Sequence, residues 1–87
     1  MKSFEALFSE LEVKATSSSA GSNTVQLLES GVHAIGKKIV EEAAEVWMAC
    51  EFQTKEQASE EIAQLIYHVQ VMMIAKGISL KDIEKFL

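Results

Sequence analysis

The sequence predicts an all-α fold: two long antiparallel helices plus short terminal helices, completing a helical bundle in a homodimer. The chain has no proline, it is rich in helix-forming Ala, Glu, Lys, Leu and Met, and its apolar residues recur at steps of three and four. With 87 residues it is expected to form one domain, 1–87, which alone buries only about 60–65% of its unfolded surface. Because 48% of its residues are hydrophobic, we expect apolar surface to be shared with a second copy.

The N-terminal third is expected to hold two short helices and a polar loop. Ser3 is a candidate N-cap for a helix whose apolar positions follow helical spacing; these are Phe4, Leu7, Phe8 and Leu11. Residues 14–24 include four serines and are expected to form a flexible loop, either a plain connector or a lid ordered by substrate. Thr24 is expected to cap a helical turn that Gly31 ends.

The first long helix is expected over about residues 32–52. Its apolar residues fall within roughly an 80° sector and predict a buried stripe; they are Val32, Ile35, Ile39, Ala43, Val46 and Cys50. We interpret Cys50 as a buried small hydrophobe and Met48 as core filling. Trp47, the only tryptophan, and Tyr67 are interpreted as contacts between helices or between subunits.

Capping signals define the remaining helices. Thr54 and Gln57 have the spacing of a capping box, which predicts a second long helix running to about Lys76 with Gly77 as its C-terminal cap. Ser79 is expected to open a last short helix.

Composition excludes several classes of protein. The net charge is −5 and the pI is about 4.9, which argues against a protein that binds the backbone of a nucleic acid. No apolar run approaches the roughly 20 residues that span a bilayer, and no signal-peptide core is present. A single cysteine provides no disulfide framework. These features predict a cytoplasmic chain with no nucleic-acid or membrane partner.

Three carboxylates lie within two turns of the first long helix, at Glu41, Glu42 and Glu45. Glu41 and Glu45 are like charges at i,i+4, which is mildly destabilising without a cation. Mg²⁺ prefers a few carboxylates together with waters and substrate phosphates. The cluster alone is typical of a solvent-exposed acidic helix face, and a metal-binding site is the alternative interpretation.

The second long helix adds a matching row. Glu61, Gln64 and His68 follow at i, i+3 and i+7 beside an apolar band. If the two helices pack antiparallel, Glu61 faces the glutamates of the first helix across a groove, and converging carboxylates need a cation or a shared proton. His68 is interpreted as a hydrogen-bonded groove residue, with a ligand role as the alternative.

Several stretches together resemble a known family, the phosphoribosyl-ATP pyrophosphohydrolases of the MazG-like all-α superfamily. The pattern E-E-x-x-E on one helix and E-x-x-D on the next is similar to residues 41–45 and 61–64. The stretches 22–31, 36–45, 61–68 and 77–83 extend the resemblance along nearly the whole chain. Position 64 departs from the pattern, since Gln64 replaces the aspartate.

The resemblance implies a fold, a reaction and a set of site residues. The reaction is hydrolysis of phosphoribosyl-ATP to phosphoribosyl-AMP and pyrophosphate with Mg²⁺, the second step of histidine biosynthesis. The implied metal ligands are Glu41, Glu42, Glu45 and Glu61, with Gln64 as an uncharged oxygen donor. Lys38 is implied to stand near the phosphates. From their positions, Lys37 and His68 are further candidate substrate contacts, with a solvated face as the favoured alternative for Lys37, and Glu42 or Glu45 is the expected general base. The alternatives are a housekeeping nucleoside triphosphate pyrophosphohydrolase and a non-enzymatic helical dimerisation module.

Overall fold

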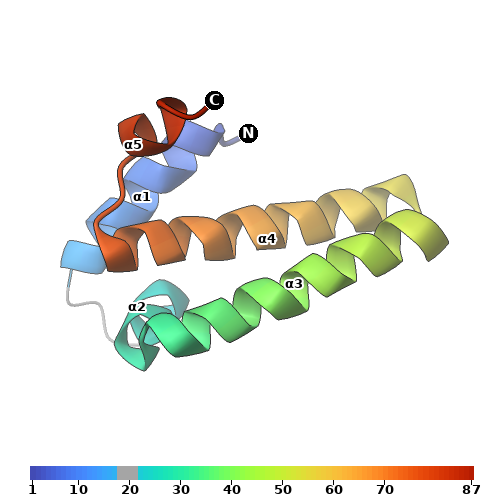
Figure 1. Cartoon of the computed structure of the whole chain (residues 1–87), viewed down its shortest axis with the longest axis horizontal. Helices are drawn as coiled ribbons and strands as arrows, with labels where there is room; N and C mark the ends of the chain where they lie inside the picture. The colour runs from blue at the N-terminus through green and yellow to red at the C-terminus, as the bar shows by residue number, and fades with distance from the viewer. Residues whose placement is uncertain (18–21) are drawn as a thin grey trace.

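The computed structural model describes residues 1–17 and 22–87, and all regular structure in these ranges is helical. The five helices are α1 (Phe4–Thr16), α2 (Asn23–Ser30), α3 (Val32–Phe52), α4 (Lys55–Lys76) and α5 (Leu80–Glu84). The long helices α3 and α4 lie antiparallel and make the most extensive helix–helix contact (Figure 1). The predicted all-α fold with two long packed helices is confirmed, and the homodimer remains a prediction.

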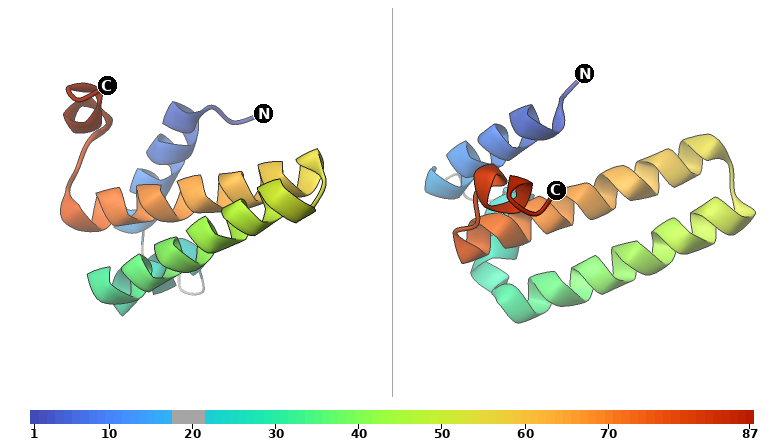
Figure 2. Two further views of the ribbon diagram at one scale, coloured as in Figure 1. Left: turned by 45° about the vertical axis from the view of Figure 1, so that its right-hand side comes forward. Right: turned by 45° about the horizontal axis from the view of Figure 1, so that its top comes forward.

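The short helices α1, α2 and α5 gather at one end of the α3–α4 hairpin, where α3 begins and α4 ends (Figures 1 and 2). The main core lies at this end, where Leu11, Ile35 and Val71 are buried from three different helices. The turn that joins α3 to α4 projects away from the short helices. Side chains near this turn therefore have fewer neighbours within the chain.

The caps expected from the sequence are present. Ser3 accepts a hydrogen bond from the backbone N–H of Ala6 at 3.1 Å, which holds the first turn of α1. The capping box of Thr54 and Gln57 begins α4, and Gly77 ends it with a φ of +67°, a conformation that costs glycine little. The sequence predicts these helix ends correctly because each cap depends only on neighbouring residues.

The expected loop over 14–24 is shorter than predicted at both ends. α1 continues to Thr16 and α2 begins at Asn23, while residues 18–21 lie outside the described part of the chain. The expectation that Thr24 caps a helix is wrong, because Ser22 occupies the N-cap position. Thr24 is instead buried, and its hydroxyl lies 2.7 Å from that of Tyr67.

Tyr67 is therefore a contact between helices, tying α2 to α4, and we expect Tyr67→Phe to destabilise the fold. The change leaves the buried Thr24 hydroxyl without this partner, which costs about 1–2 kcal/mol. For a domain of this size that lowers the Tm by roughly 4–16 °C. Calorimetric melting of the variant tests this. In a Thr24→Val background the same change should cost less, because both polar partners are then gone, and an equal loss in both backgrounds would contradict the assigned bond.

The buried stripe of α3 is rotated from the predicted one. The residues that are buried or half-buried along the α4 side are Ile35, Ile39, Glu42, Val46 and Ala49. Their mean direction lies about 40° from the predicted centre, towards Glu42, at 100° per residue. Val32, Ala43 and Cys50 are exposed, so the prediction of a buried Cys50 is wrong. The apolar sector of α3 is wider than one partner helix can cover.

The aromatic and thioether side chains near the hairpin turn are exposed. Met48 is 56% and Trp47 68% exposed, so the prediction that Met48 fills the core is wrong. The Trp47 Nε1–H donates to a carboxylate oxygen of Glu51 at 2.6 Å, a residue of the same helix. Trp47 is thus bonded along α3, and the predicted contact between subunits stays a prediction.

Candidate metal-binding active site

Three of the predicted ligands converge between the two long helices. Glu42 and Glu45 come from α3 and Glu61 from α4, and their carboxylate oxygens lie within 4.8 Å of one another. We call these three residues the carboxylate cluster. The i,i+3 spacing puts Glu42 and Glu45 on neighbouring turns of one face. Antiparallel pairing then brings Glu61, in the second turn of α4, opposite them.

The surroundings of the carboxylate cluster disfavour the charged form of its side chains. Burial raises the pKa of Glu42 above its ordinary value, and the neighbouring carboxyl group of Glu45 raises it further. Burial and Glu45 likewise raise the pKa of Glu61. The Oε2 atom of Glu42 is buried and has no hydrogen-bond partner among the described residues. A buried carboxylate oxygen without a donor is costly, so this oxygen of Glu42 lacks a partner.

A hard divalent cation fits this donor set. All three side chains offer carboxylate oxygens, which are the ligands that Mg²⁺ and Ca²⁺ prefer. A cation among them would supply the partner that Glu42 Oε2 lacks and would turn the mutual repulsion into attraction. Two or three carboxylates leave coordination positions for water and phosphate oxygens, which is the usual protein environment of Mg²⁺.

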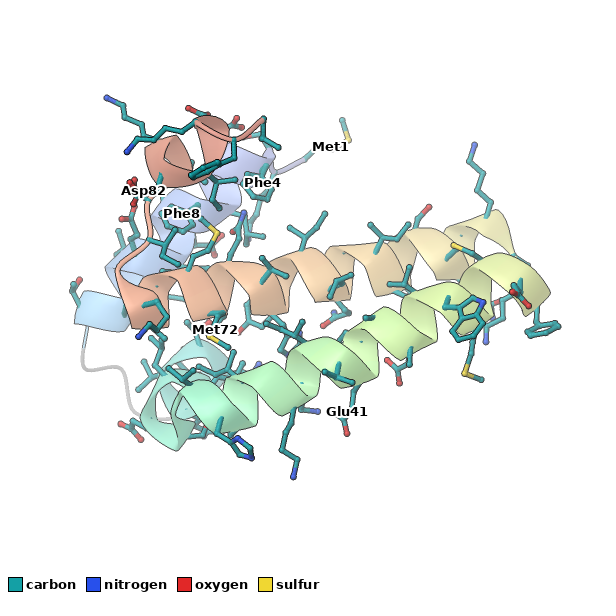
Figure 3. All side chains as sticks on the ribbon, in the orientation of Figure 1. Met1, Phe4, Phe8, Glu41, Met72 and Asp82 are labelled. Carbon is teal, nitrogen blue, oxygen red and sulfur yellow. The ribbon has the colours of Figure 1, made fainter. Side chains whose placement is uncertain are left out.

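Glu41 lies outside the carboxylate cluster. Its side chain is exposed and pairs with the Lys38 ammonium at 3.4 Å, and it points away from α4 (Figure 3). It stands about 120° around α3 from the line that faces α4. Both Lys37 and Lys38 are exposed on α3. The positive charge of Lys38 lowers the pKa of Glu42, so Lys38 is the lysine that stands close to the cluster.

His68 and Gln64 are linked to each other rather than to the cluster. His68 is buried, and its Nδ1 lies 2.8 Å from the backbone carbonyl oxygen of Gln64. A carbonyl oxygen only accepts, so Nδ1 carries the proton in this bond. A positive charge on the His68 ring would lower the pKa of Glu42, which places the ring near the cluster. The side chain of Gln64 is exposed.

Beside the carboxylate cluster lies a hollow that the sequence did not indicate. It encloses about 210 Å³ and is lined by Glu45, Met48, Gln53 and Glu61; we call it the turn hollow. Met48 follows Glu45 by three residues and so lies on the same side of α3. That spacing is the available signal, whereas the interpretation of Met48 as core filling rests on its residue type alone.

The fold and the site together define a class of protein. It is an all-α protein whose central hairpin presents a group of carboxylates suited to a divalent cation and, through it, to phosphate groups. A family model described as phosphoribosyl-ATP pyrophosphohydrolase matches residues 1–87. The chain belongs to this family.

Curated relatives agree with the family match. A phosphoribosyl-ATP pyrophosphatase of Streptomyces coelicolor is 63% identical over 83 residues, which cover 94% of this chain and 92% of the relative. The protein of the same name from Streptomyces avermitilis is 61% identical over the same share of each chain. That of Bifidobacterium adolescentis is 58% identical over 87 residues and the full length of both chains. The resemblance inferred from the sequence motifs is thereby confirmed.

Proposed function

We propose that this chain hydrolyses phosphoribosyl-ATP to phosphoribosyl-AMP and pyrophosphate at the carboxylate cluster, in a Mg²⁺-dependent reaction. Membership of the family makes it a phosphoribosyl-ATP diphosphatase of histidine biosynthesis. The observation that carries the proposed site is the convergence of Glu42, Glu45 and Glu61 within 4.8 Å. A chain with net charge −5 repels a polyphosphate, so the reaction is expected to require the metal strictly.

The side chains of the site have different roles in the proposed reaction. Glu42, Glu45 and Glu61 would hold Mg²⁺, which when bound neutralises phosphate charge and orients the attacking water. Lys38 stands on the side of the cluster towards the start of α3, where its ammonium attracts phosphate oxygens. Gln64 carries no charge where the family pattern has aspartate, so the three glutamates supply the negative charge that balances the cation.

Glu42 is the best candidate for the general base. A base works best when its pKa lies near the working pH, and in the metal-free chain burial together with Glu45 raises the pKa of Glu42 above its ordinary value. Its carboxylate has two oxygens, so one would bind the cation while the other accepts the proton of the attacking water. Glu45 is more exposed and better suited to a ligand role alone.

Pyrophosphate release from phosphoribosyl-ATP, beside a panel of ordinary and damaged nucleoside triphosphates, tests this function. We expect fast turnover of phosphoribosyl-ATP, abolished when Mg²⁺ is removed by a chelator. Preference for another triphosphate would indicate a housekeeping nucleoside triphosphate pyrophosphohydrolase instead. No release from any substrate would favour a binding module instead.

We further propose that the chain works as a homodimer that buries the exposed apolar side of the hairpin. On α3 this side holds Val32, Val40, Ala43, Trp47 and Cys50, all exposed and within about 80° of one another. Ile62 and Val69 of α4 are exposed as well, and the geometry of two antiparallel right-handed helices puts them on the same side. Contiguous exposed apolar surface marks an interface. Here this surface lies on the opposite side of the hairpin from Glu45.

Val40→Glu is expected to convert the dimer to a monomer. Val40 is 70% exposed in the single chain and central in the proposed interface, where a buried charge without a partner is strongly unfavourable. Analytical ultracentrifugation measures the mass. The matched control is Val13→Glu, which changes an equally exposed valine on α1 and should leave the dimer intact. A wild-type chain that sediments as a monomer, or a Val40→Glu dimer, would contradict the assignment.

We place the reaction in the cytoplasm. None of the helices in the described ranges is long and apolar enough to cross a membrane. Fractionation of cells that express the tagged chain tests this location, and recovery in a membrane or exported fraction would contradict it.

A further inference from the structure

We propose that the turn hollow is the subsite for the adenine base, with Met48 packing on the ring and the Gln53 amide pairing with its edge. This inference rests on the proposed function, since it assumes that the substrate phosphates are held at the carboxylate cluster. It assigns a role in substrate specificity to two side chains, Met48 and Gln53, that take no part in the metal site.

The position of the hollow determines which part of the substrate it can take. Glu45 and Glu61 belong both to the carboxylate cluster and to the hollow, so whatever fills the hollow adjoins the metal site. A volume of about 210 Å³ is smaller than the roughly 300–1,000 Å³ of a pocket for a whole small-molecule ligand. The hollow therefore accommodates one part of the nucleotide.

The lining excludes the phosphates and favours the base. The four side chains that line it include two carboxylates and no cation, so phosphate groups are repelled. Met48 is 56% exposed and offers an adaptable apolar surface that suits contact with a flat aromatic ring. The Gln53 side chain offers a donor and an acceptor, the combination that pairs with N6 and N7 of adenine. Among the described residues, no side chain or backbone group hydrogen-bonds that amide.

The order of side chains along α3 indicates which end of the substrate lies towards the hairpin turn. Lys38 precedes the carboxylate cluster, and Met48 and Gln53 follow it towards the hairpin turn. The positive charge of Lys38 attracts the departing pyrophosphate, so the nucleoside must extend the other way. From Glu45 to Phe52, the last residue of α3, the helix rises by about 10 Å and Gln53 follows directly, which is enough length for a nucleoside. The exposed apolar side of the hairpin, assigned to the dimer, lies away from Met48.

Two variants test the subsite with two different inhibitors. AMP carries the base without a pyrophosphate group, whereas pyrophosphate carries no base. We expect Gln53→Leu and Met48→Ala each to raise KM and the inhibition constant of AMP about 10-fold, with kcat changed less than about threefold. Inhibition by pyrophosphate in Mg²⁺ should not change. The controls are Gln26→Leu on α2 and Val13→Ala on α1, which change exposed side chains outside the hollow.

The outcomes separate this inference from the proposed function. If the wild-type chain does not turn over phosphoribosyl-ATP, the proposed function fails, and calorimetric titration of AMP into wild type and Gln53→Leu still tests the subsite. Equal weakening of AMP and pyrophosphate, unchanged inhibition by AMP, or dissociation of Met48→Ala into monomers would each overturn it. Weakened AMP binding with unchanged pyrophosphate inhibition in a dimer supports it.

Discussion

Replacing Glu42 with glutamine is expected to lower kcat by about 100-fold or more, because the amide can neither accept the proton of the attacking water nor offer a negative charge to the metal. The same change should raise the stability of the metal-free chain. Glu42 is half-buried beside Glu45 and Glu61, and removal of a like-charge neighbour relieves roughly 0.5 kcal/mol, or about 2–4 °C in Tm. Pyrophosphate release and thermal melting measure the two effects.

The matched control is Glu41→Gln, one residue earlier on the same helix. Glu41 is exposed and pairs with Lys38 at 3.4 Å, and exposed ion pairs contribute little to stability. We expect this variant to keep most of its activity. If Glu41→Gln loses as much activity as Glu42→Gln, the metal is held by a different set of carboxylates. If Glu42→Gln retains full activity, the carboxylate cluster is not the active site.

Saturating Mg²⁺ is expected to stabilise the folded chain. A ligand that binds only the folded state at 100 times its Kd adds about 2.7 kcal/mol, which for a domain of this size raises the Tm by roughly 10–20 °C. Differential scanning calorimetry with Mg²⁺ and with a chelator measures this increase. The increase should shrink in Glu42→Gln and persist in Glu41→Gln. No shift in the wild type, with or without substrate, would favour the helical dimerisation module.

The metal also reverses the expected pH dependence of stability. The pKa values of Glu42 and Glu61 are raised in the folded chain above the ordinary value of 4.5, so above that pH the folded state binds more protons than the unfolded state. Their contribution is fully present below pH 4.5 and is lost as the pH rises through the raised values. Mg²⁺ requires deprotonated ligands, so its stabilisation grows over the same range. The difference in Tm between wild type and Glu42→Gln, followed across this pH range, measures the part of the effect that Glu42 contributes.

The ends of the helices could be predicted from the sequence because caps depend on local chemistry. Ser3, the pair Thr54 and Gln57, and Gly77 act on backbone groups within a few residues of themselves. Thr24 is the exception, and the reason is tertiary: its partner is the hydroxyl of Tyr67, 43 residues away in the sequence. No local pattern predicts such a bond.

The rotation of α3 could not be predicted from the sequence. Its apolar sector includes residues that face α4, such as Ile35 and Ala49, and residues left exposed, such as Cys50 and Val40. Periodicity shows that both sets are apolar but cannot tell which edge packs within the chain. The actual rotation turns Glu42 towards α4 and leaves Glu41 on the exposed side. The same uncertainty explains why the family resemblance implies four carboxylates at the metal site whereas the structure brings together three.

The most direct test of the account is the position of Mn²⁺, which takes the same oxygen ligands as Mg²⁺ and is identified by its anomalous scattering in a crystal of the wild-type chain. We predict an anomalous peak bound by carboxylate oxygens of Glu42, Glu45 and Glu61, and no such peak in crystals of Glu42→Gln. A peak bound by Glu41 without Glu42, or no ordered ion with substrate analogue present, would contradict the central claim that this cluster is the metal site.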